Sequence, residues 1–263
     1  MRFGAGEGYA SSRRLVTLRQ RRLVGRYRIE SLLAIGGFAK IYRGFDLDRR
    51  RRVAIKVPAT RYRRRAAIEE FRHEAIENRK LRHPNVLPVL DFFVEDDTPV
   101  LVTPLGRTSL AERLERTLPR ARLLRYANEM LAALAHAHRR RLMHLDVKPE
   151  NLIVLWSGRL ALGDFGTARR GRRTVVGDRT GTTGYMPPEQ AAGHPSPRSD
   201  VYAAGVVIRE MLHGRGRPEA RPHRRLYIGL QALVECATQE QARRRYRDAV
   251  AMLAELRRIE RGS

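Results

Sequence analysis

The sequence predicts an α+β protein with two lobes, a small β-rich N-terminal lobe with one helix and a larger α-helical C-terminal lobe. Three observations support this prediction. Segments rich in β-branched and aromatic residues, with turn signals between them, follow one another in the first part of the chain. A single segment with helical apolar spacing interrupts them. After Gly106 the apolar spacing is that of helices, so the lobe boundary is expected near residues 104–107.

The N-terminal lobe is expected to contain a sheet and one helix. The strand-like segments are Tyr27–Ile35, Ile41–Leu47, Val53–Val57, Val86–Val94 and Pro99–Thr103. Apolar residues recur at helical spacing over residues 64–81. The sequence His83-Pro84-Asn85 ends this helix, because the residue before a proline is pushed out of the helical region.

The clearest helix of the C-terminal lobe is expected over residues 120–141. Its apolar face is formed by residues at i, i+3, i+4 and i+7 spacing, namely Leu123, Ala127, Met130, Leu131, Leu134 and His138. Residues 198–213 and 245–259 have the same kind of pattern. The expected organisation is therefore a basic flexible arm over residues 1–22, an N-terminal lobe over 23–105 and a C-terminal lobe over 106–263.

Composition indicates a folded, soluble, cytoplasmic protein. Of the 263 residues, 42% are hydrophobic and 31% are charged, a balance that supports a sizeable core. The longest apolar runs fall short of the roughly 18 residues of a membrane span, so no membrane association is expected. Cys236 is the single cysteine, which excludes an internal disulfide framework and a cysteine-based metal cluster and fits a reducing cytosol.

The charge balance is extreme. Lys and Arg total 53 against 28 Asp and Glu, which gives a net charge of +25. The arm of residues 1–22 contributes six arginines and one glutamate, a net charge of +5. Such a surplus attracts anions. A non-specific polyanion or an acidic protein is therefore expected as a partner, and sequence-specific nucleic-acid binding is not expected, because aromatic residues make up only 6%.

Five short motifs occur in a fixed order along the chain. The most informative is His144-Leu145-Asp146-Val147-Lys148-Pro149-Glu150-Asn151, which is followed by Asp164-Phe165-Gly166 and then by Pro187-Pro188-Glu189. Upstream lies Val53-Ala54-Ile55-Lys56, preceded by a glycine-containing turn around Gly36 and Gly37. Each motif alone is weak, but the ordered set at these spacings is specific. Over about residues 24–258 the chain resembles the eukaryotic-like serine/threonine protein kinases of bacteria.

The resemblance implies a two-lobed protein kinase-like fold that uses ATP and Mg²⁺ and transfers the γ-phosphate to serine or threonine of a protein substrate. The catalytic residues would be Asp146, Lys148 and Asn151. Asp146 would accept or orient the proton of the substrate hydroxyl, and Lys148 would offset charge on the transferring phosphate. Asn151 and Asp164 would be the metal ligands, since both offer the oxygen atoms that Mg²⁺ prefers.

The resemblance also implies a nucleotide-binding set. Lys56 would hold the α- and β-phosphates and pair with a glutamate of the following helix, for which the spacing favours Glu74 over Glu70 and Glu77. The other positions implied to bind the cofactor are Gly36, Gly37, Ile41, Ala54, Thr103, Pro104, Gly106 and Asp164. Asp200 is implied to anchor the catalytic loop, and Arg245 or Arg244 is implied to pair with Glu189.

The chain departs from the kinase pattern at three informative positions. Ala34 and Ala39 replace the first and third glycines of the glycine loop, which predicts a stiffer loop. Leu145 replaces the arginine that, in kinases of this type, pairs with a phosphorylated threonine of the activation segment, which here is the segment between Asp164 and Glu189. Candidate acceptors there are Thr174 and Thr180. Without the arginine, activity is expected not to depend on this phosphorylation, and a bound partner or polyanion is expected to order the segment.

Three alternatives to a protein kinase remain open at this stage. The chain could be a pseudokinase scaffold, a small-molecule kinase with the same fold, or a polyanion-binding regulator. An active serine/threonine kinase is favoured because the lysine, the base and the metal ligands are all present.

Overall fold

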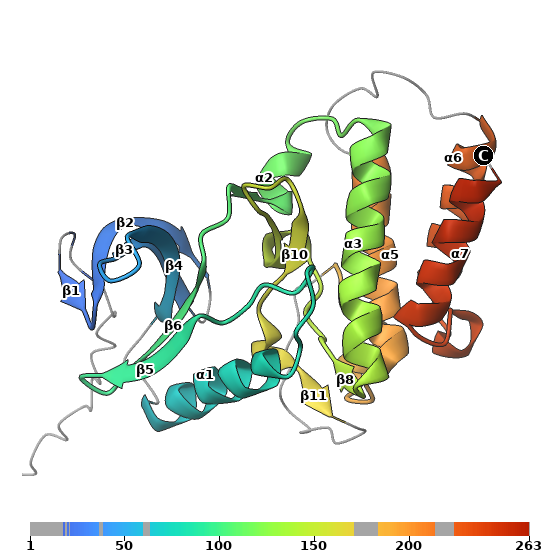
Figure 1. Cartoon of the computed structure of the whole chain (residues 1–263). Coiled ribbons are helices and arrows are strands. Elements are labelled where there is room, and N and C mark those ends of the chain that lie inside the picture. The colour runs from blue at the N-terminus through green and yellow to red at the C-terminus, as the bar shows by residue number, and fades with distance from the viewer. Residues whose placement is uncertain are drawn as a thin grey trace, which may run out of the picture. The chain divides into compact units, whose positions relative to one another are not determined.

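The structure is a computed structural model that describes residues 18, 20, 22–36, 39–59, 64–170, 184–213 and 224–262. It divides into two compact units. We call Met1–Arg72 with Asp91–Val102 the β unit, and His73–Leu90 with Thr103–Ser263 the helical unit. Figure 1 labels the elements of both.

The β unit is built on a six-stranded sheet with strand order β1-β2-β3-β4-β6-β5. The strands are β1 (Leu23–Val24), β2 (Tyr27–Ile35), β3 (Ala39–Asp46), β4 (Arg51–Pro58), β5 (Asp91–Glu95) and β6 (Thr98–Pro104). The pairs β1–β2, β2–β3, β3–β4 and β5–β6 are antiparallel. The predicted sheet is confirmed.

Alternation of side chains fixes which face of the sheet is buried. On β4 the side chains of Val53, Ile55 and Val57 are fully buried, and they point to one face because successive residues of a strand alternate. Lys56, between two of them, is on the other face and is half-buried. The helix α1 (Arg64–Arg79) begins in the β unit, where its Phe71 is buried.

Four long helices form most of the helical unit. They are α3 (Arg120–Arg139), α5 (Pro197–His213), α6 (Arg224–Ala237) and α7 (Ala249–Arg261). The helix α3 packs against α5 and α7, and α6 packs against α5 and α7; Figure 1 shows α3 and α5 running side by side. The predicted apolar stripe of α3 is confirmed: Leu123, Ala127, Met130, Leu131 and Leu134 are all buried.

Ten short elements complete the described part of the helical unit. In chain order they are β7 (Thr108–Ser109), α2 (Leu110–Leu114), β8 (Leu142–Met143), η1 (Pro149–Asn151), β9 (Leu152–Val154), β10 (Leu160–Leu162), η2 (Phe165–Thr167), β11 (Arg169–Arg170), α4 (Pro188–Ala191) and η3 (Ala242–Arg244). Strands β10, β9 and β7 form one small sheet, and β11 pairs with β8.

The predicted strand over residues 86–94 is wrong for its first half. The strand begins only at Asp91, and Val86 makes an isolated parallel bridge with Leu162. The side chain of Asn78 explains this difference, because it donates to the carbonyl oxygen of Leu87 and accepts from the N–H of Val89. A side chain therefore takes the hydrogen bonds that a neighbouring strand would have supplied.

Two further differences concern helices. The helix predicted over 245–259 begins at Ala249, because the Asp248 side chain accepts from the N–H of Ala251 and caps the helix there. The helix α6 was not predicted. Its buried residues, Leu226, Leu230, Leu233, Val234 and Ala237, do follow a helical period.

Candidate active site

The loop between β8 and η1 brings together the three predicted catalytic residues. Lys148 Nζ lies 2.9 Å from Asp146 Oδ2. The amide of Asn151 donates to the same Oδ2 at 3.0 Å and to the backbone oxygen of Asp146 at 2.8 Å. One carboxylate oxygen thus accepts from both neighbours. The arrangement fixes the carboxylate of Asp146 and keeps a cation beside it.

The buried carboxylate of Asp200 anchors this loop through hydrogen bonds to its backbone. Its carboxylate accepts from the backbone N–H of His144 (Oδ2, 2.8 Å) and of Leu145 (Oδ1, 2.7 Å), and Oδ2 also lies 2.8 Å from His138 Nε2. Burial raises the pKa of Asp200, but the hydrogen bond from His138, with help from the N–H of Leu145, outweighs burial and lowers it. Asp200 is therefore a charged anchor in the core.

His144 connects the loop to the segment that contains Asp164. It is fully buried, its Nε2 lies 2.8 Å from the carbonyl oxygen of Gly163, and its ring contacts Phe165 edge-on at 4.6 Å between centroids. The N–H of Asp146 donates to His144 Nδ1 at 3.3 Å. Since Nδ1 accepts, Nε2 carries the proton and donates to Gly163. His144 is a structural link here.

Asp164 has a backbone conformation that few non-glycine residues adopt, with φ of 61° and ψ of 66°. The glycine at position 166 leaves room for two carboxylates. A Cβ atom there would lie 3.3 Å from Asp164 Oδ1 and 3.3 Å from Glu74 Oε2. Of the three glutamates considered on α1, Glu70 is exposed and Glu77 binds Lys80 at 2.7 Å. Glu74 is buried and lies beside the Asp164–Gly166 turn.

The remaining predicted nucleotide-binding residues of the sheet lie on β3 and β4. Lys56 is paired in register with Ile41, and its Nζ lies 5.5 Å from the centre of the Phe71 ring. Ala54, two residues earlier, shares the strand face with Lys56 because strand side chains alternate. These side chains thus line one face of the β unit.

Gly36 closes the turn between β2 and β3, since its N–H donates to Ala39 O at 2.8 Å. Neither Ala34 nor Ala39 is among the described residues with positive φ, so the alanines adopt ordinary strand backbone. Gly37, which was also predicted to bind the cofactor, lies outside the described residues.

The segment 103–106 leads from β6 into the helical unit. Thr103 and Pro104 end β6 and are half-buried. Gly106 has a packing reason to be glycine, because a Cβ atom there would come within 2.1 Å of Ile153 Cγ2. The N–H of Arg107 then donates to the carbonyl oxygen of Val154.

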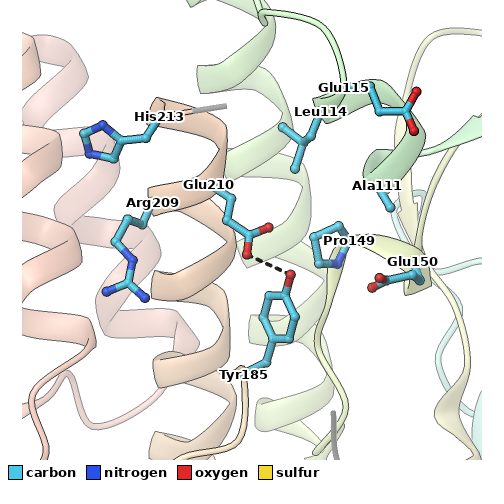
Figure 2. Close-up of a pocket in the computed structure, with 9 residues that line it drawn as sticks. All are labelled: Ala111, Leu114, Glu115, Pro149, Glu150, Tyr185, Arg209, Glu210 and His213. Atoms are coloured by element: carbon cyan, nitrogen blue, oxygen red, sulfur yellow. Dashed lines mark hydrogen bonds between the residues drawn. The ribbon is translucent and has the colours of Figure 1, made fainter. Parts of the chain in front are cut away.

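A hollow of about 650 Å³ lies next to the loop, entirely within the helical unit. Figure 2 shows its centre, where the Tyr185 hydroxyl donates to Glu210 Oε1 at 2.8 Å and both face Pro149. Burial and this hydrogen bond raise the pKa of Tyr185. Three carboxylates line the hollow, from Glu115, Glu150 and Glu210, against one arginine, Arg209, and His213.

Comparison with known families agrees with this geometry. The protein kinase domain family matches residues 27–247. The chain belongs to the protein kinase family.

Curated relatives of this kinase domain are bacterial serine/threonine kinases. Serine/threonine-protein kinase PknL of Mycobacterium tuberculosis is 34% identical over 267 residues, which cover 90% of this chain and 66% of PknL. PknA of the same species is 39% identical over 214 residues, covering 75% of this chain and 49% of PknA. PrkC of Bacillus subtilis is 33% identical over 203 residues, covering 74% of this chain and 31% of PrkC. The chain thus spans only part of each of these relatives.

The ion pair predicted for Glu189 is made by Arg245. Its guanidinium binds the carboxylate through two bonds, Nη1 to Oε1 at 2.7 Å and Nη2 to Oε2 at 3.1 Å. The side chain of Arg245 is fully buried, whereas Arg244 is exposed. The one-residue ambiguity of the sequence is therefore resolved in favour of Arg245.

Some functional positions of this kinase domain were not singled out from the sequence. Gln190 donates its side-chain amide to the carbonyl oxygen of Leu145 at 2.7 Å, and His138 binds Asp200. Gln190 contacts a backbone oxygen, and His138 lies far from Asp200 in the sequence. Motif spacing therefore gives no signal that would identify either residue. Tyr185 and Glu210 could have been found only by placing α5 against the loop.

The donor set of the kinase domain fits a hard divalent cation. The Asn151 amide nitrogen donates to Asp146, so its amide oxygen would be the atom that ligates a cation, and Asp164 would add a carboxylate. Among the described residues no group of three or more His, Cys, Asp or Glu side chains could hold a metal ion.

Within the described part of the chain, none of the helices has the length and apolar character needed to cross a bilayer. The candidate acceptors Thr174 and Thr180 lie outside the described residues.

Proposed function

We propose that this kinase domain transfers the γ-phosphate of ATP to serine or threonine hydroxyls of proteins. The observation that carries the proposal is the Asp146–Lys148–Asn151 cluster, in which Lys148 Nζ and Asn151 Nδ2 both lie within 3.0 Å of Asp146 Oδ2, on a loop bound to a buried carboxylate. Phosphoryl transfer demands positioning and charge neutralisation more than covalent chemistry, and this cluster supplies both. The likeness to PknL, PknA and PrkC supports serine or threonine as the acceptor.

Each residue has a distinct proposed role. Asp146 orients the substrate hydroxyl and takes its proton, and Lys148 neutralises charge on the phosphate in transfer. Asn151 and Asp164 hold Mg²⁺, which neutralises phosphate oxygens when bound. Lys56 binds the α- and β-phosphates, with Glu74 as its proposed partner.

The rest of the nucleotide-binding set is proposed on the resemblance. Gly36 and Gly37 would cover the phosphates, and Ile41 and Ala54 would contact the base. Thr103, Pro104 and Gly106 would line the adenine side. The carbonyl of Pro104 can still accept a hydrogen bond, although its nitrogen carries no hydrogen.

The charge of the hollow beside Pro149 favours a basic protein substrate. Its three glutamates and one arginine leave it acidic, in a chain whose net charge is +25. A carboxylate recognises a guanidinium group well, because its two oxygens match the planar fork of donors that Arg offers. We expect Glu210→Gln to raise the KM for an arginine-containing peptide about tenfold with little change for a neutral peptide. Equal KM changes for both peptides, measured by steady-state kinetics, would remove the hollow from substrate binding.

A reducing cytosol remains the expected location, on the single cysteine, and an acidic or polyanionic partner remains a prediction from the charge. The competing hypotheses are a pseudokinase, a small-molecule kinase and a polyanion-binding regulator. They differ in what the purified chain does with ATP.

The deciding experiment is transfer of radiolabelled γ-phosphate to a generic basic protein and to the chain itself. We expect Mg²⁺-dependent transfer to serine and threonine, which Asp146→Asn or Lys56→Met reduces by at least about a hundredfold. Asp164→Ala should abolish both the activity and its metal dependence.

A matched control is Lys80→Met, because Lys80 is exposed and its ammonium group pairs with Glu77, three residues earlier in the chain. It should keep full activity. ATP binding without transfer to any hydroxyl would support the pseudokinase, and transfer to small molecules alone would support the small-molecule kinase.

A further inference from the structure

The backbone of Leu145 is held at both its N–H and its carbonyl oxygen by side chains that are distant in sequence. Its N–H donates to Asp200 Oδ1 at 2.7 Å, and its carbonyl oxygen accepts from Gln190 Nε2 at 2.7 Å. Leu145 is buried, and its φ of 65° lies in the left-handed region, which leucine rarely adopts. A backbone in such a conformation persists only where its surroundings fix it.

The two groups that hold Leu145 come from one platform. Gln190 follows Glu189 on α4, and Glu189 binds the buried Arg245 through two hydrogen bonds. The hydroxyl of Ser199 donates to Glu189 Oε1 at 2.9 Å, and Ser199 directly precedes Asp200 on α5. The starts of α4 and α5 are thus tied together, so Gln190 and Asp200 act from a common rigid base.

The bond from Gln190 fixes the peptide plane that carries the catalytic aspartate. The carbonyl of Leu145 and the N–H of Asp146 belong to the same planar peptide. The other bond to that plane is long, 3.3 Å from the N–H of Asp146 to His144 Nδ1. The 2.7 Å bond at the carbonyl therefore dominates the orientation of the plane, and with it the direction in which the side chain of Asp146 leaves the backbone.

We propose that Gln190 is a positioning residue for Asp146, which it holds in place through the carbonyl of Leu145, and that it links the end of the activation segment to the catalytic loop. In kinases with an arginine at position 145, that link uses the arginine and a phosphate. The side chain of Leu145 has neither a charge nor a hydrogen-bond donor. Here the link runs instead from the backbone carbonyl of Leu145 to the uncharged amide of Gln190. The inference rests on the proposed kinase activity.

The test compares Gln190→Ala and Gln190→Glu with wild type and with Gln239→Ala. Gln239 is the matched control, because its amide also donates to a backbone carbonyl, that of Glu235, but on an exposed helix end. We expect Gln190→Ala to lower kcat about tenfold while the KM values for ATP and for a peptide stay within about twofold. Gln239→Ala should leave kcat unchanged.

Gln190→Glu gives a readout that a merely structural role would not produce. An ionised carboxylate repels the Leu145 carbonyl, but a protonated one donates to it as the amide does. The kcat of Gln190→Glu relative to wild type should therefore rise as pH falls from 7 to 5, toward the ordinary glutamate pKa of about 4.3, while that of Gln190→Ala stays flat. A kcat loss that is equal and pH-independent in both variants would overturn the proposal, as would an unchanged kcat.

A measurement without turnover separates this proposal from the proposed function. Amide hydrogen exchange of the His144–Asp146 segment should speed up at least about fivefold in Gln190→Ala and stay at the wild-type rate in Gln239→Ala. A wild-type chain that transfers no phosphate but shows this exchange pattern would contradict the kinase activity and leave the link intact. Unchanged exchange in Gln190→Ala, with an active wild type, would overturn the link alone.

Discussion

At the scale of single residues, Asp200 shows how a buried charge is made tolerable. It is fully buried, yet two backbone N–H groups and His138 Nε2 satisfy its carboxylate. The N–H of Ala249 donates to His138 Nδ1 at 3.1 Å. Nδ1 therefore accepts, and the proton of a neutral His138 lies on Nε2, toward Asp200. One carboxylate thereby joins α3, the catalytic loop and the start of α7.

Replacement of Asp200 by asparagine should destabilise the protein by about 2–4 kcal/mol at pH 7, because an NH₂ group would then face one of these donors. The lowered pKa of Asp200 means that its charged form stabilises the fold above the ordinary aspartate pKa of about 3.9, and that this contribution is lost as pH falls through the lower folded-state value. The stability difference between variant and wild type should therefore shrink only below about pH 4.

Urea unfolding at several pH values measures this difference, with Asp48→Asn, an exposed aspartate, as the control. A difference that stays the same down to pH 3 would mean that the carboxylate charge of Asp200 does not contribute.

At the scale of elements, the end of α3 meets the segment after α1 through two histidine rings that are tilted by 38° to each other. The rings of His83 and His136 lie 4.8 Å apart, and Arg140 Nη1 lies 3.2 Å from His136 Nδ1. Partial burial, together with the charges of Arg140 and Arg139, lowers the pKa of both histidines. Each is therefore neutral at physiological pH, and this contact loses stability as pH falls from about 6.5 through the lowered values.

Arg140→Gln should raise the pKa of both imidazoles toward 6.5, because it removes the nearest cation. Histidine NMR titration measures the shift, and Arg159→Gln on the β10 side is a control that keeps the cluster intact. If the two pKa values do not move in Arg140→Gln, then the charge of Arg140 does not contribute to them.

Elements with a clear apolar period were predicted well, and the exceptions have physical causes. The stripe from Leu123 to Leu134 identifies α3 because each of these side chains enters the core. Residues 86–90 look like a strand, yet Asn78 takes their hydrogen bonds. Within the site, motif spacing led to Asp146, Lys148 and Asn151. Gln190 could not be found in this way, because its partner is a backbone oxygen and only the packing of α4 brings the two together.

At the scale of the whole molecule, a net charge of +25 coexists with an acidic hollow beside the catalytic loop. The two act over different ranges. At physiological salt the Debye length is about 8 Å, so charges further apart than this are largely screened. The net charge therefore affects how other molecules approach the surface, and the glutamates act only on a side chain that is already in the hollow. The proposed basic substrate would thus be repelled at long range and held at short range, whereas an acidic partner would be attracted to the surface outside the hollow.

The surplus charge should make the protein bind heparin, with an affinity that falls steeply as salt rises, because each contact releases counterions. Deletion of residues 1–22 removes a net charge of +5 out of +25. The truncated protein should therefore elute from a heparin column at lower salt than the full chain but still be retained. Arginines of the described surface, such as Arg49 and Arg50 at the exposed tip between β3 and β4, account for the remaining binding. Retention that does not depend on salt, or a truncated protein that no longer binds at low salt, would contradict a charge spread over the whole molecule.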